Sequence, residues 1–178
     1  MRLRDLPFQA MGGQPAFTPE ALERFVAAPR IAVLAYTKRD RSPAQAPIWY
    51  HYEDGRFYMV TQATSPKAKA LAREKRACLT IQDEMPPYRA AIIDGEITVS
   101  PAPLEGGITG GLAVRYFGRV SAAEYEKMTL EENRKTGLSL LTFEPIRVRG
   151  FDNHNLVGLA LRLYMRVREL LPIPREWL

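Results

Sequence analysis

The chain has 178 residues, of which 46% are hydrophobic and 25% charged, which is enough for one domain with a substantial core and cramped for two. Its net charge of +5 favours an anionic ligand or partner but does not say which. No apolar run is long enough to cross a bilayer, and the N-terminus has no continuous apolar stretch, so we expect a cytoplasmic protein. One cysteine and two histidines argue against a metal site.

The first half of the chain predicts one helix and a series of strands with short connections. The helix covers residues 18–28 and carries Leu22, Phe25 and Val26 on one face, which we expect to close an end of a barrel. The Asp54-Gly55 pair favours a tight hairpin between two strands. The short connections indicate an antiparallel barrel, a mainly β fold with helices at its edges. The predicted strands cover residues 31–36, 45–52, 55–61, 77–82 and 89–100.

The segment from Thr61 to Leu71 joins a strand to a helix whose first turn suits an anion. Ser65 is a good N-cap, and proline follows it at the first helical position. Lys67 and Lys69 place two ammonium groups near amides that lack partners within the helix, as a phosphate site would require. The same residues also suit an ordinary surface helix with solvated lysines, and the segment alone leaves both interpretations open.

The second half is more helical. Glycines within residues 106–111 indicate a flexible loop, because they lack the spacing of phosphate-binding motifs. Residues 121–124 fit a capping box, which predicts a helix over about 122–135. A last barrel strand is predicted over 138–149, where Pro145 indicates an edge or a bulge.

A further helix is predicted near the C-terminus, over residues 155–170. Its leucines recur near helical spacing, and three arginines lie elsewhere on its circumference. Such a helix can pack on the barrel, cover a site or lie on an anionic membrane surface. We expect packing within the chain and do not expect peripheral membrane contact.

The order and spacing of these segments closely resemble those of the pyridoxamine-5'-phosphate-oxidase-like split β-barrel family of flavin and deazaflavin proteins. The strand with Pro47 and Trp49, the helix start at Lys67 and the Pro87-Tyr88-Arg89 segment are most similar to the branch that uses the deazaflavin coenzyme F-420. The resemblance covers residues 18–152. It implies a split antiparallel barrel of the FMN-binding type over that range, with residues 1–17 as an N-terminal extension and 153–178 as a C-terminal helical extension.

The resemblance also implies a cofactor site over the second and third strands. Pro47 would leave neighbouring backbone groups free for the ring, Trp49 would form an aromatic wall or pack in the core, and Lys67 and Lys69 would hold a phosphate. No catalytic residue is identified, although Tyr50, His51 and Tyr88 are candidate proton donors. The cofactor-binding residues implied in this way are Gln45, Ala46, Pro47, Ile48, Trp49, Thr61, Ser65, Lys67, Lys69 and Tyr88.

The resulting hypothesis is an oxidoreductase that uses reduced coenzyme F-420 to transfer a hydride to an unidentified small organic acceptor. The alternatives are an FMN-dependent enzyme of the same family and a non-catalytic carrier of a flavin or tetrapyrrole. The resemblance implies a homodimer, with the loop around Tyr88 contributed by the partner. We do not expect a nucleic-acid-binding protein, because the basic clusters have acidic and apolar neighbours and lack interleaved aromatic residues.

Overall fold

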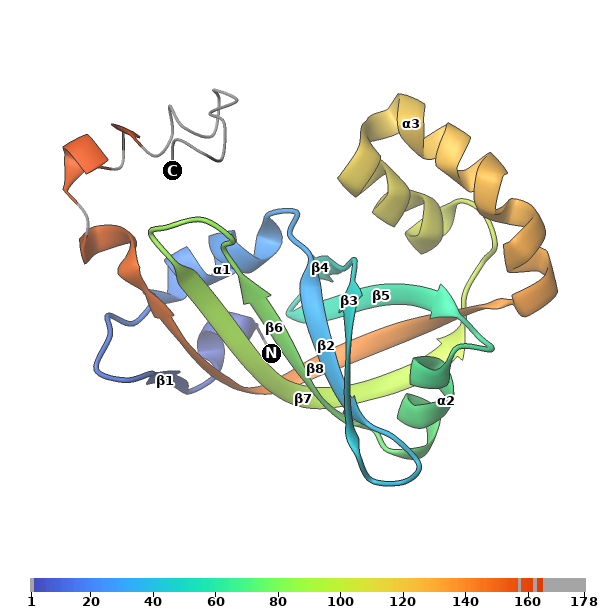
Figure 1. The fold of residues 1–178 in the computed structure, drawn as a ribbon, viewed down its shortest axis with the longest axis horizontal. Helices are drawn as coiled ribbons and strands as arrows, with labels where there is room; N and C mark the ends of the chain where they lie inside the picture. The colour runs from blue at the N-terminus through green and yellow to red at the C-terminus, as the bar shows by residue number, and fades with distance from the viewer. Residues whose placement is uncertain (1, 157, 162, 165–178) are drawn as a thin grey trace, which may run out of the picture.

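A computed structural model of the chain, which describes residues 2–156, 158–161 and 163–164, has an eight-stranded sheet with helices at its edges (Figure 1). The strand order is β3-β2-β6-β7-β8-β5-β4, and β1 pairs with β8 off this path. The strands are β1 (Phe8–Ala10), β2 (Ala32–Thr37), β3 (Pro43–Ile48), β4 (His51–Glu53), β5 (Arg56–Gln62), β6 (Arg76–Gln82), β7 (Arg89–Pro101) and β8 (Leu138–Asp152). The helices are η1 (Leu3–Asp5), α1 (Pro19–Ala27), α2 (Pro66–Arg73), α3 (Gly107–Thr136) and η2 (Asn153–Leu156).

Two long strands, β7 and β8, hold the two halves of the barrel together. They pair with each other along their whole length, while β6 pairs with the first half of β7 and β5 with the first half of β8. The β7–β8 register shifts next to Gly95, which pairs with Pro145, so the predicted irregularity at this proline is a bulge. The connectivity is that of the split antiparallel barrel predicted from the sequence.

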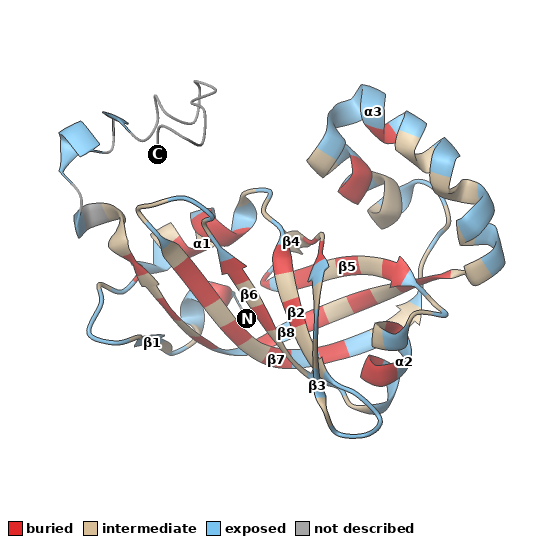
Figure 2. Ribbon diagram, viewed as in Figure 1, coloured by how far each residue is buried: buried red, intermediate tan, exposed pale blue. Residues whose placement is uncertain are grey.

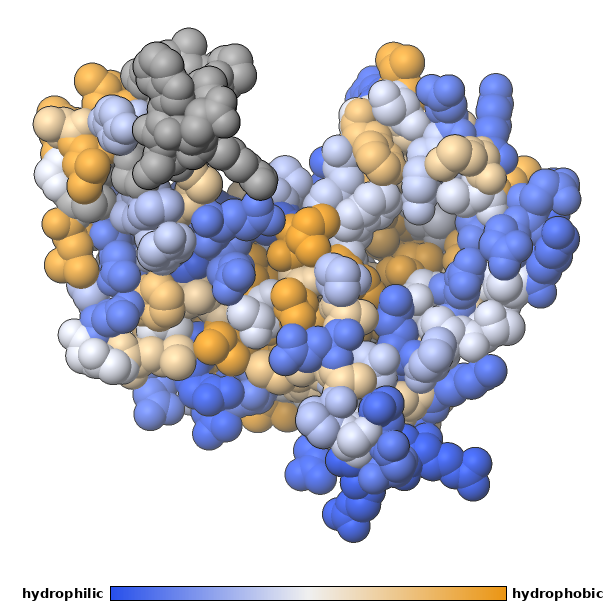
Figure 3. Space-filling model, in the orientation of Figure 1, coloured by the Kyte–Doolittle hydropathy of each residue, from blue (hydrophilic) through white to orange (hydrophobic). Residues whose placement is uncertain are grey.

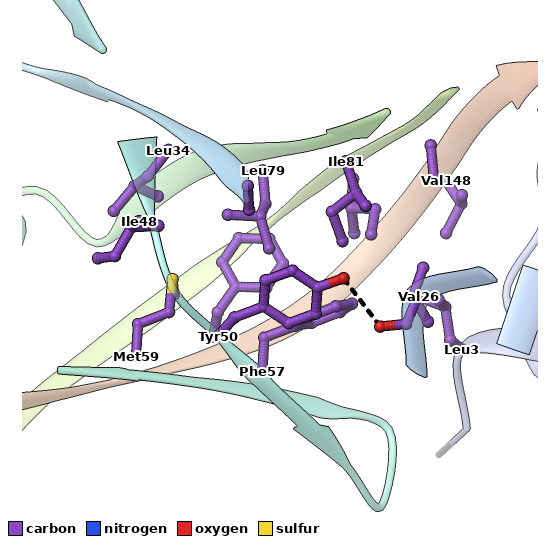
Figure 4. Close-up of a cluster of buried hydrophobic side chains, with 14 of the residues drawn as sticks. Leu3, Val26, Leu34, Ile48, Tyr50, Phe57, Met59, Leu79, Ile81 and Val148 are labelled. Carbon is purple, nitrogen blue, oxygen red and sulfur yellow. Dashed lines mark hydrogen bonds between the residues drawn. The ribbon is translucent and has the colours of Figure 1, made fainter. Parts of the chain in front are cut away.

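The core fills the space between the two halves of the sheet, and α1 closes one end (Figures 2 and 4). Thr18 caps α1 by accepting a hydrogen bond from the Ala21 amide at 3.2 Å, and the predicted apolar face of this helix is buried. Tyr50 lies wholly inside the core, where its hydroxyl donates to the Val26 carbonyl at 2.9 Å (Figure 4). The predicted tight hairpin is present: Asp54 and Gly55 both have positive φ, at 49° and 80°.

The predicted strand 45–52 is two strands, with the break at Trp49 and Tyr50. Below the break β3 pairs with β2, and above it β4 pairs with β5, so the chain changes partners there. At the break the Tyr50 amide donates to the hydroxyl of Tyr116 at 3.0 Å, which replaces a hydrogen bond of the strand ladder. A partner from α3, 66 residues away, cannot be inferred from local alternation.

The predictions for residues 106–111 and for the start of the next helix are wrong. Gly106 has φ of 63° and stands at the N-cap of α3, so the glycine-rich segment opens a helix instead of forming a loop. Thr109 secures the first turn by donating to the Pro103 carbonyl at 2.7 Å. Gly118, with φ of 75° and ψ of 167°, kinks α3, and the second part of the helix therefore begins before the supposed cap at Ser121.

Residues before Thr18 are part of the packed structure. Leu3 of η1 is 1% exposed and Phe17 6% exposed, and both belong to the core cluster. The short β1 pairs with β8 in the parallel direction, with Phe8 opposite Val148. The sequence analysis had not predicted this strand.

Of the predicted C-terminal helix, 155–170, the structure describes residues 155–156, 158–161 and 163–164, and residues 159–161 and 163–164 are helical. The described part contains η2, which ends at Leu156. Among the described residues, no helix has both the length and the apolar composition needed to span a membrane.

Candidate functional site

The first turn of α2 has the cap predicted from the sequence. The Ser65 hydroxyl accepts from the Ala68 amide at 3.2 Å, and the Ser65 carbonyl accepts from the Lys69 amide at 3.2 Å. Pro66 has no amide hydrogen, so the Lys67 N–H is the first-turn donor left without a partner within the described residues. The helix therefore offers one free amide beside a lysine, fewer than the sequence had suggested.

Lys67 is half-buried, and burial lowers the pKa of its ammonium below the ordinary lysine value. In the part of the chain that the structure describes, no carboxylate lies within 4.0 Å of this ammonium. A buried cation without a counter-ion carries a desolvation cost that a bound anion would offset. Lys69, by contrast, is exposed.

A cavity of about 310 Å³ lies against Lys67. It brings together four of the residues predicted to bind a cofactor, from β3, the residue after it, and α2. Its other lining residues are apolar or aromatic, and Lys67 is the only charged residue among the described residues that line it. We call it the Lys67 cavity; its lining is Ile31, Pro47, Ile48, Trp49, Val60, Lys67 and Tyr125.

The remaining predicted residues do not line this cavity. Gln45 and Ala46 sit on β3, where they pair with Ala35 and Leu34 of β2. Because β3 is the last strand of the sheet, its outer edge carries backbone groups that β2 does not pair. Those groups are the donors and acceptors that the sequence analysis assigned to the polar edge of a ring.

Thr61 and Ser65 lie behind the cavity. Their hydroxyl oxygens are 3.4 Å apart, and Ser65 is engaged in capping α2. Thr61 is buried and lines a second cavity described below. Tyr88 is 50% exposed at the start of β7, and its carbonyl accepts from the Asn153 amide.

Aromatic side chains from α3 cover Trp49, and the sequence analysis did not find them. The Tyr116 ring stacks on Trp49 with centroids 5.0 Å apart and an interplanar angle of 12°. Phe117 meets Trp49 edge-on at 5.0 Å, and Tyr125 lies at 5.4 Å. The Tyr116 hydroxyl also donates to the Arg30 carbonyl at 2.7 Å, which ties α3 to the chain entering β2. Tyr116 and Phe117 lie directly before the kink at Gly118. Two aromatic residues followed by a glycine are the sequence signal that could have indicated a bend packed against the barrel.

A second cavity, of about 220 Å³, lies under α3 and adjoins the Lys67 cavity. The two share Trp49, Val60 and Tyr125 in their walls. Figure 3 shows hydrophobic surface at the base of the recess between α3 and the barrel. We call it the α3 cavity; its other lining residues are Thr61, Gln62, Leu104, Thr109, Leu112, Ala113, Glu126, Thr129, Glu132, Asn133 and Leu138.

A third cavity, of about 950 Å³, lies at the C-terminal end of α2. Its two acidic residues are already paired: Asp94 with Arg147 at 2.7 Å, and Glu74 with Arg76 at 3.3 Å. The lining is therefore strongly basic, and we call it the basic cavity. Its six cationic residues are Lys38, Arg39, Arg41, Arg73, Arg76 and Arg147.

Two of the candidate proton donors can be placed relative to these cavities. Tyr50 is fully buried, donates to backbone carbonyls and has a pKa raised far above its ordinary value by burial, so it is unsuited to proton transfer. His51 lies on β4, with its Nε2 atom 3.7 Å from Glu53.

Burial also raises the pKa of the Cys78 thiol to about 11, as expected of an inert cysteine. Among the described residues, no group of three or more His, Cys, Asp or Glu could hold a metal ion.

Comparison with protein families identifies the chain. The family model described as pyridoxamine 5'-phosphate oxidase matches residues 18–152. The chain belongs to the pyridoxamine 5'-phosphate oxidase family. The barrel of this family is a flavin-binding oxidoreductase fold, and the Lys67 cavity lies at its edge. None of the curated proteins matches the chain.

Solved structures with the same fold include a conserved hypothetical protein from Mycobacterium tuberculosis, with a TM-score of 0.66 and 20% identity over 84% of this chain and 97% of that one. A structure titled F420 reductase has a TM-score of 0.59 and 17% identity over 71% of this chain and 94% of that one. A FAD-binding protein from Mesorhizobium loti has a TM-score of 0.50 and 13% identity, covering 74% and 90%. At these identities the likeness shows the fold.

Proposed function

We propose that this protein is an oxidoreductase that holds reduced coenzyme F-420 in the Lys67 cavity and reduces a small organic acceptor. The observation that carries the proposal is the meeting of Lys67, Trp49 and the free edge of β3 in one cavity. In this cavity Lys67 complements an anionic group, Trp49 complements a flat aromatic ring, and the free backbone groups of β3 complement the polar edge of that ring. Membership of the pyridoxamine 5'-phosphate oxidase family and the fold shared with an F420 reductase support this choice of ligand.

Lys67 and its own amide would hold the phosphate, with the N-terminal end of α2 adding a favourable dipole. Pro47 and Ile48 would lie along one edge of the ring, and Trp49 would form a wall against it. When bound, the reduced deazaflavin would supply a hydride, and the one proton that completes the two-electron reduction of the acceptor would come from solvent. The protein's part is to orient the ring and to keep water from its reactive face, for which the aromatic cover from α3 is well placed.

The basic cavity favours F-420 over FMN. Coenzyme F-420 carries a polyglutamyl tail beyond its phosphate, whereas FMN ends at the phosphate. Because α2 has eight residues, the basic cavity at its end lies about 12 Å from its first turn. Arg73 lines this cavity, where it could contact such a tail, while Lys69 and Lys75 do not line it.

We also propose that the protein acts as a homodimer in which the loop before β7 reaches the partner's cofactor. Met85 and Tyr88 are 37% and 50% exposed, as interface anchors in a single chain would be. Both flank a proline pair that stiffens the loop. Analytical ultracentrifugation should give twice the mass of the chain, and a monomer with bound cofactor would contradict this part of the proposal.

The test is a fluorescence titration of the purified protein with F-420 and, separately, with FMN. Lys67→Ala should weaken F-420 binding by about 10- to 100-fold, since it removes a charge-assisted contact from a partly buried site. Lys69→Ala is the matched control, two residues along the same helix but exposed, and should change affinity less than twofold. Tighter binding of FMN would move the assignment to a flavin enzyme; failure of both ligands to bind would overturn it.

A further inference from the structure

The charged groups of the α3 cavity are both carboxylates. Among the residues that the structure describes, its lining includes two carboxylates, Glu126 and Glu132, and no lysine, arginine or histidine. The Thr109 hydroxyl already donates to the Pro103 carbonyl at 2.7 Å, and the Thr129 hydroxyl to the Tyr125 carbonyl at 3.0 Å. Because a hydroxyl has one hydrogen, both threonines have only lone pairs left to offer a ligand.

The carboxylates of this cavity are not neutralised by basic side chains within the described residues. Glu126 is half-buried, and its carboxylate accepts a hydrogen bond from the Gly106 amide at 3.4 Å. Glu132 has no ion pair in the described structure, whereas its neighbour Glu131 reaches Arg134 at 3.8 Å. Glu131 does not line the cavity. The negative charge of the lining is therefore available to a ligand.

The rest of the lining is apolar and adjoins the cofactor site. Leu104, Leu112 and Leu138 line it, and Trp49 and Tyr125 form the wall it shares with the Lys67 cavity. Two adjoining cavities thus have opposite charge: an unpaired ammonium in one and two carboxylates in the other. A ligand that fills the α3 cavity would touch the same aromatic wall as a ring in the Lys67 cavity.

We infer that the α3 cavity binds the acceptor and selects apolar or aromatic molecules that carry a protonated amine or another hydrogen-bond donor. The acceptor role rests on the proposed function; the charge preference rests on the lining alone. Anionic molecules would lose hydration on entry and gain no cationic partner, so they are disfavoured. The Lys67 cavity would bind the anionic ligand and the α3 cavity would bind the cationic one. Each ligand would therefore be disfavoured in the cavity of the other.

The charge preference can be measured without any cofactor. Two aromatic probes of similar size, 1-naphthylmethylammonium and 1-naphthylacetate, are titrated into the full-length protein by calorimetry. The cation should bind at least about fivefold more tightly, as expected for partly exposed charges facing one another. Equal affinities, or tighter binding of the anion, would overturn the inference.

Variants of the lining test which residues cause the preference for the cationic probe. The double variant Glu126→Gln and Glu132→Gln keeps side-chain volume and acceptor oxygens but removes both charges, and should bring the two affinities to within about twofold. Glu131→Gln is the control on the same helix and should leave the preference unchanged. Asn133→Lys adds a cation to the lining while keeping both carboxylates, and should weaken the preference for the cationic probe without reversing it. A preference that persists in the double variant would assign it to another surface.

The charge preference of the α3 cavity and the proposed function can be contradicted independently of each other. Lys67→Ala should weaken cofactor binding and leave the probe preference intact, because Lys67 does not line the α3 cavity. With F-420 bound, the cationic probe should still bind, since the cavities adjoin without coinciding. If F-420 excludes the probe, the acceptor role is overturned; if F-420 itself does not bind, the proposed function fails while the charge preference is judged on the calorimetry of the free protein.

Discussion

The two helices beside the site, α2 and α3, are attached to the barrel in different ways. The eight-residue α2 buries Ala68, Ala70 and Leu71, and its cap was readable from sequence. The thirty-residue α3 buries only Leu112, Ala113 and Ala122, and is kinked in its middle. The side of the site that we propose holds the cofactor is therefore built on a short helix, whereas the side that we propose holds the acceptor is built on a long, kinked helix with few buried residues. Cofactor binding and acceptor choice should respond to different substitutions.

The largest effect is expected from Lys67→Met, which should lower the affinity for the cofactor without lowering the stability of the free protein. Affinity for the phosphate-bearing cofactor should fall by about 10- to 100-fold. The free protein should keep or raise its Tm, because unfolded Lys67 binds its proton more tightly than folded Lys67, and the charged form costs stability at neutral pH. Differential scanning fluorimetry and a cofactor titration measure both. A large loss of Tm would show that Lys67 has a structural role instead.

The same lysine predicts a pH dependence. Only its protonated form attracts phosphate, and its pKa in the free protein lies below 10.5. Affinity of the wild-type protein should therefore decrease as the pH rises through that lowered pKa, and the destabilising effect of the charge should disappear over the same interval. In Lys67→Met the decrease should be absent, and a decrease of equal size in the variant would assign it to another group.

Gly118→Ala tests whether α3 depends on its kink. With φ of 75° and ψ of 167°, this position disfavours any residue with a Cβ, so the substitution should cost about 1–3 kcal/mol in urea unfolding. Gly111→Ala is the matched control on the same helix. An added Cβ there meets nothing within 4 Å, and the change should stabilise by up to about 1 kcal/mol. Cofactor affinity should change in neither variant; a loss in Gly118→Ala would show that the two helices are coupled.

Tyr116→Phe should release α3 from the barrel while keeping the stacking on Trp49. The Tyr50 amide and the Arg30 carbonyl lose their partner, with an expected cost of about 1–2 kcal/mol. Limited proteolysis should then cleave α3 faster than the barrel. Protection equal to that of the wild type would mean that other contacts hold the helix.

The smallest effect is expected from Arg73→Gln. This exposed residue should contribute about two- to threefold to the affinity for F-420 and nothing to the affinity for FMN. Titrations with both cofactors compare the two effects within one variant. A loss with both would place Arg73 at the phosphate, and no loss with either would argue against a tail in the basic cavity.

Local chemistry explains which features were predictable. The capped turn at Ser65, the hairpin at Asp54 and the apolar face of α1 are determined by neighbours within a few residues, and each was predicted correctly. The break at Tyr50 depends on Tyr116, and the aromatic cover on Trp49 joins segments far apart in the chain. The glycines of α3 could not be interpreted from composition for a similar reason. Gly106 starts the helix and Gly118 kinks it because both have positive φ, and composition does not show which glycines have positive φ. Four of the seven residues that line the Lys67 cavity were among those predicted from the sequence, whereas the α3 cavity could not be predicted.

The family match begins at residue 18, yet Leu3 and Phe17 are interior residues, and β1 adds a strand beside β8. The segment conserved as a family model and the segment that folds as a unit therefore have different boundaries. A fragment cut at residue 18 would expose the side chains that Leu3 and Phe17 now cover. Anyone shortening or fusing this chain should keep its first seventeen residues, because they carry Leu3 and Phe17 into the core, and attach a tag through a linker ahead of them.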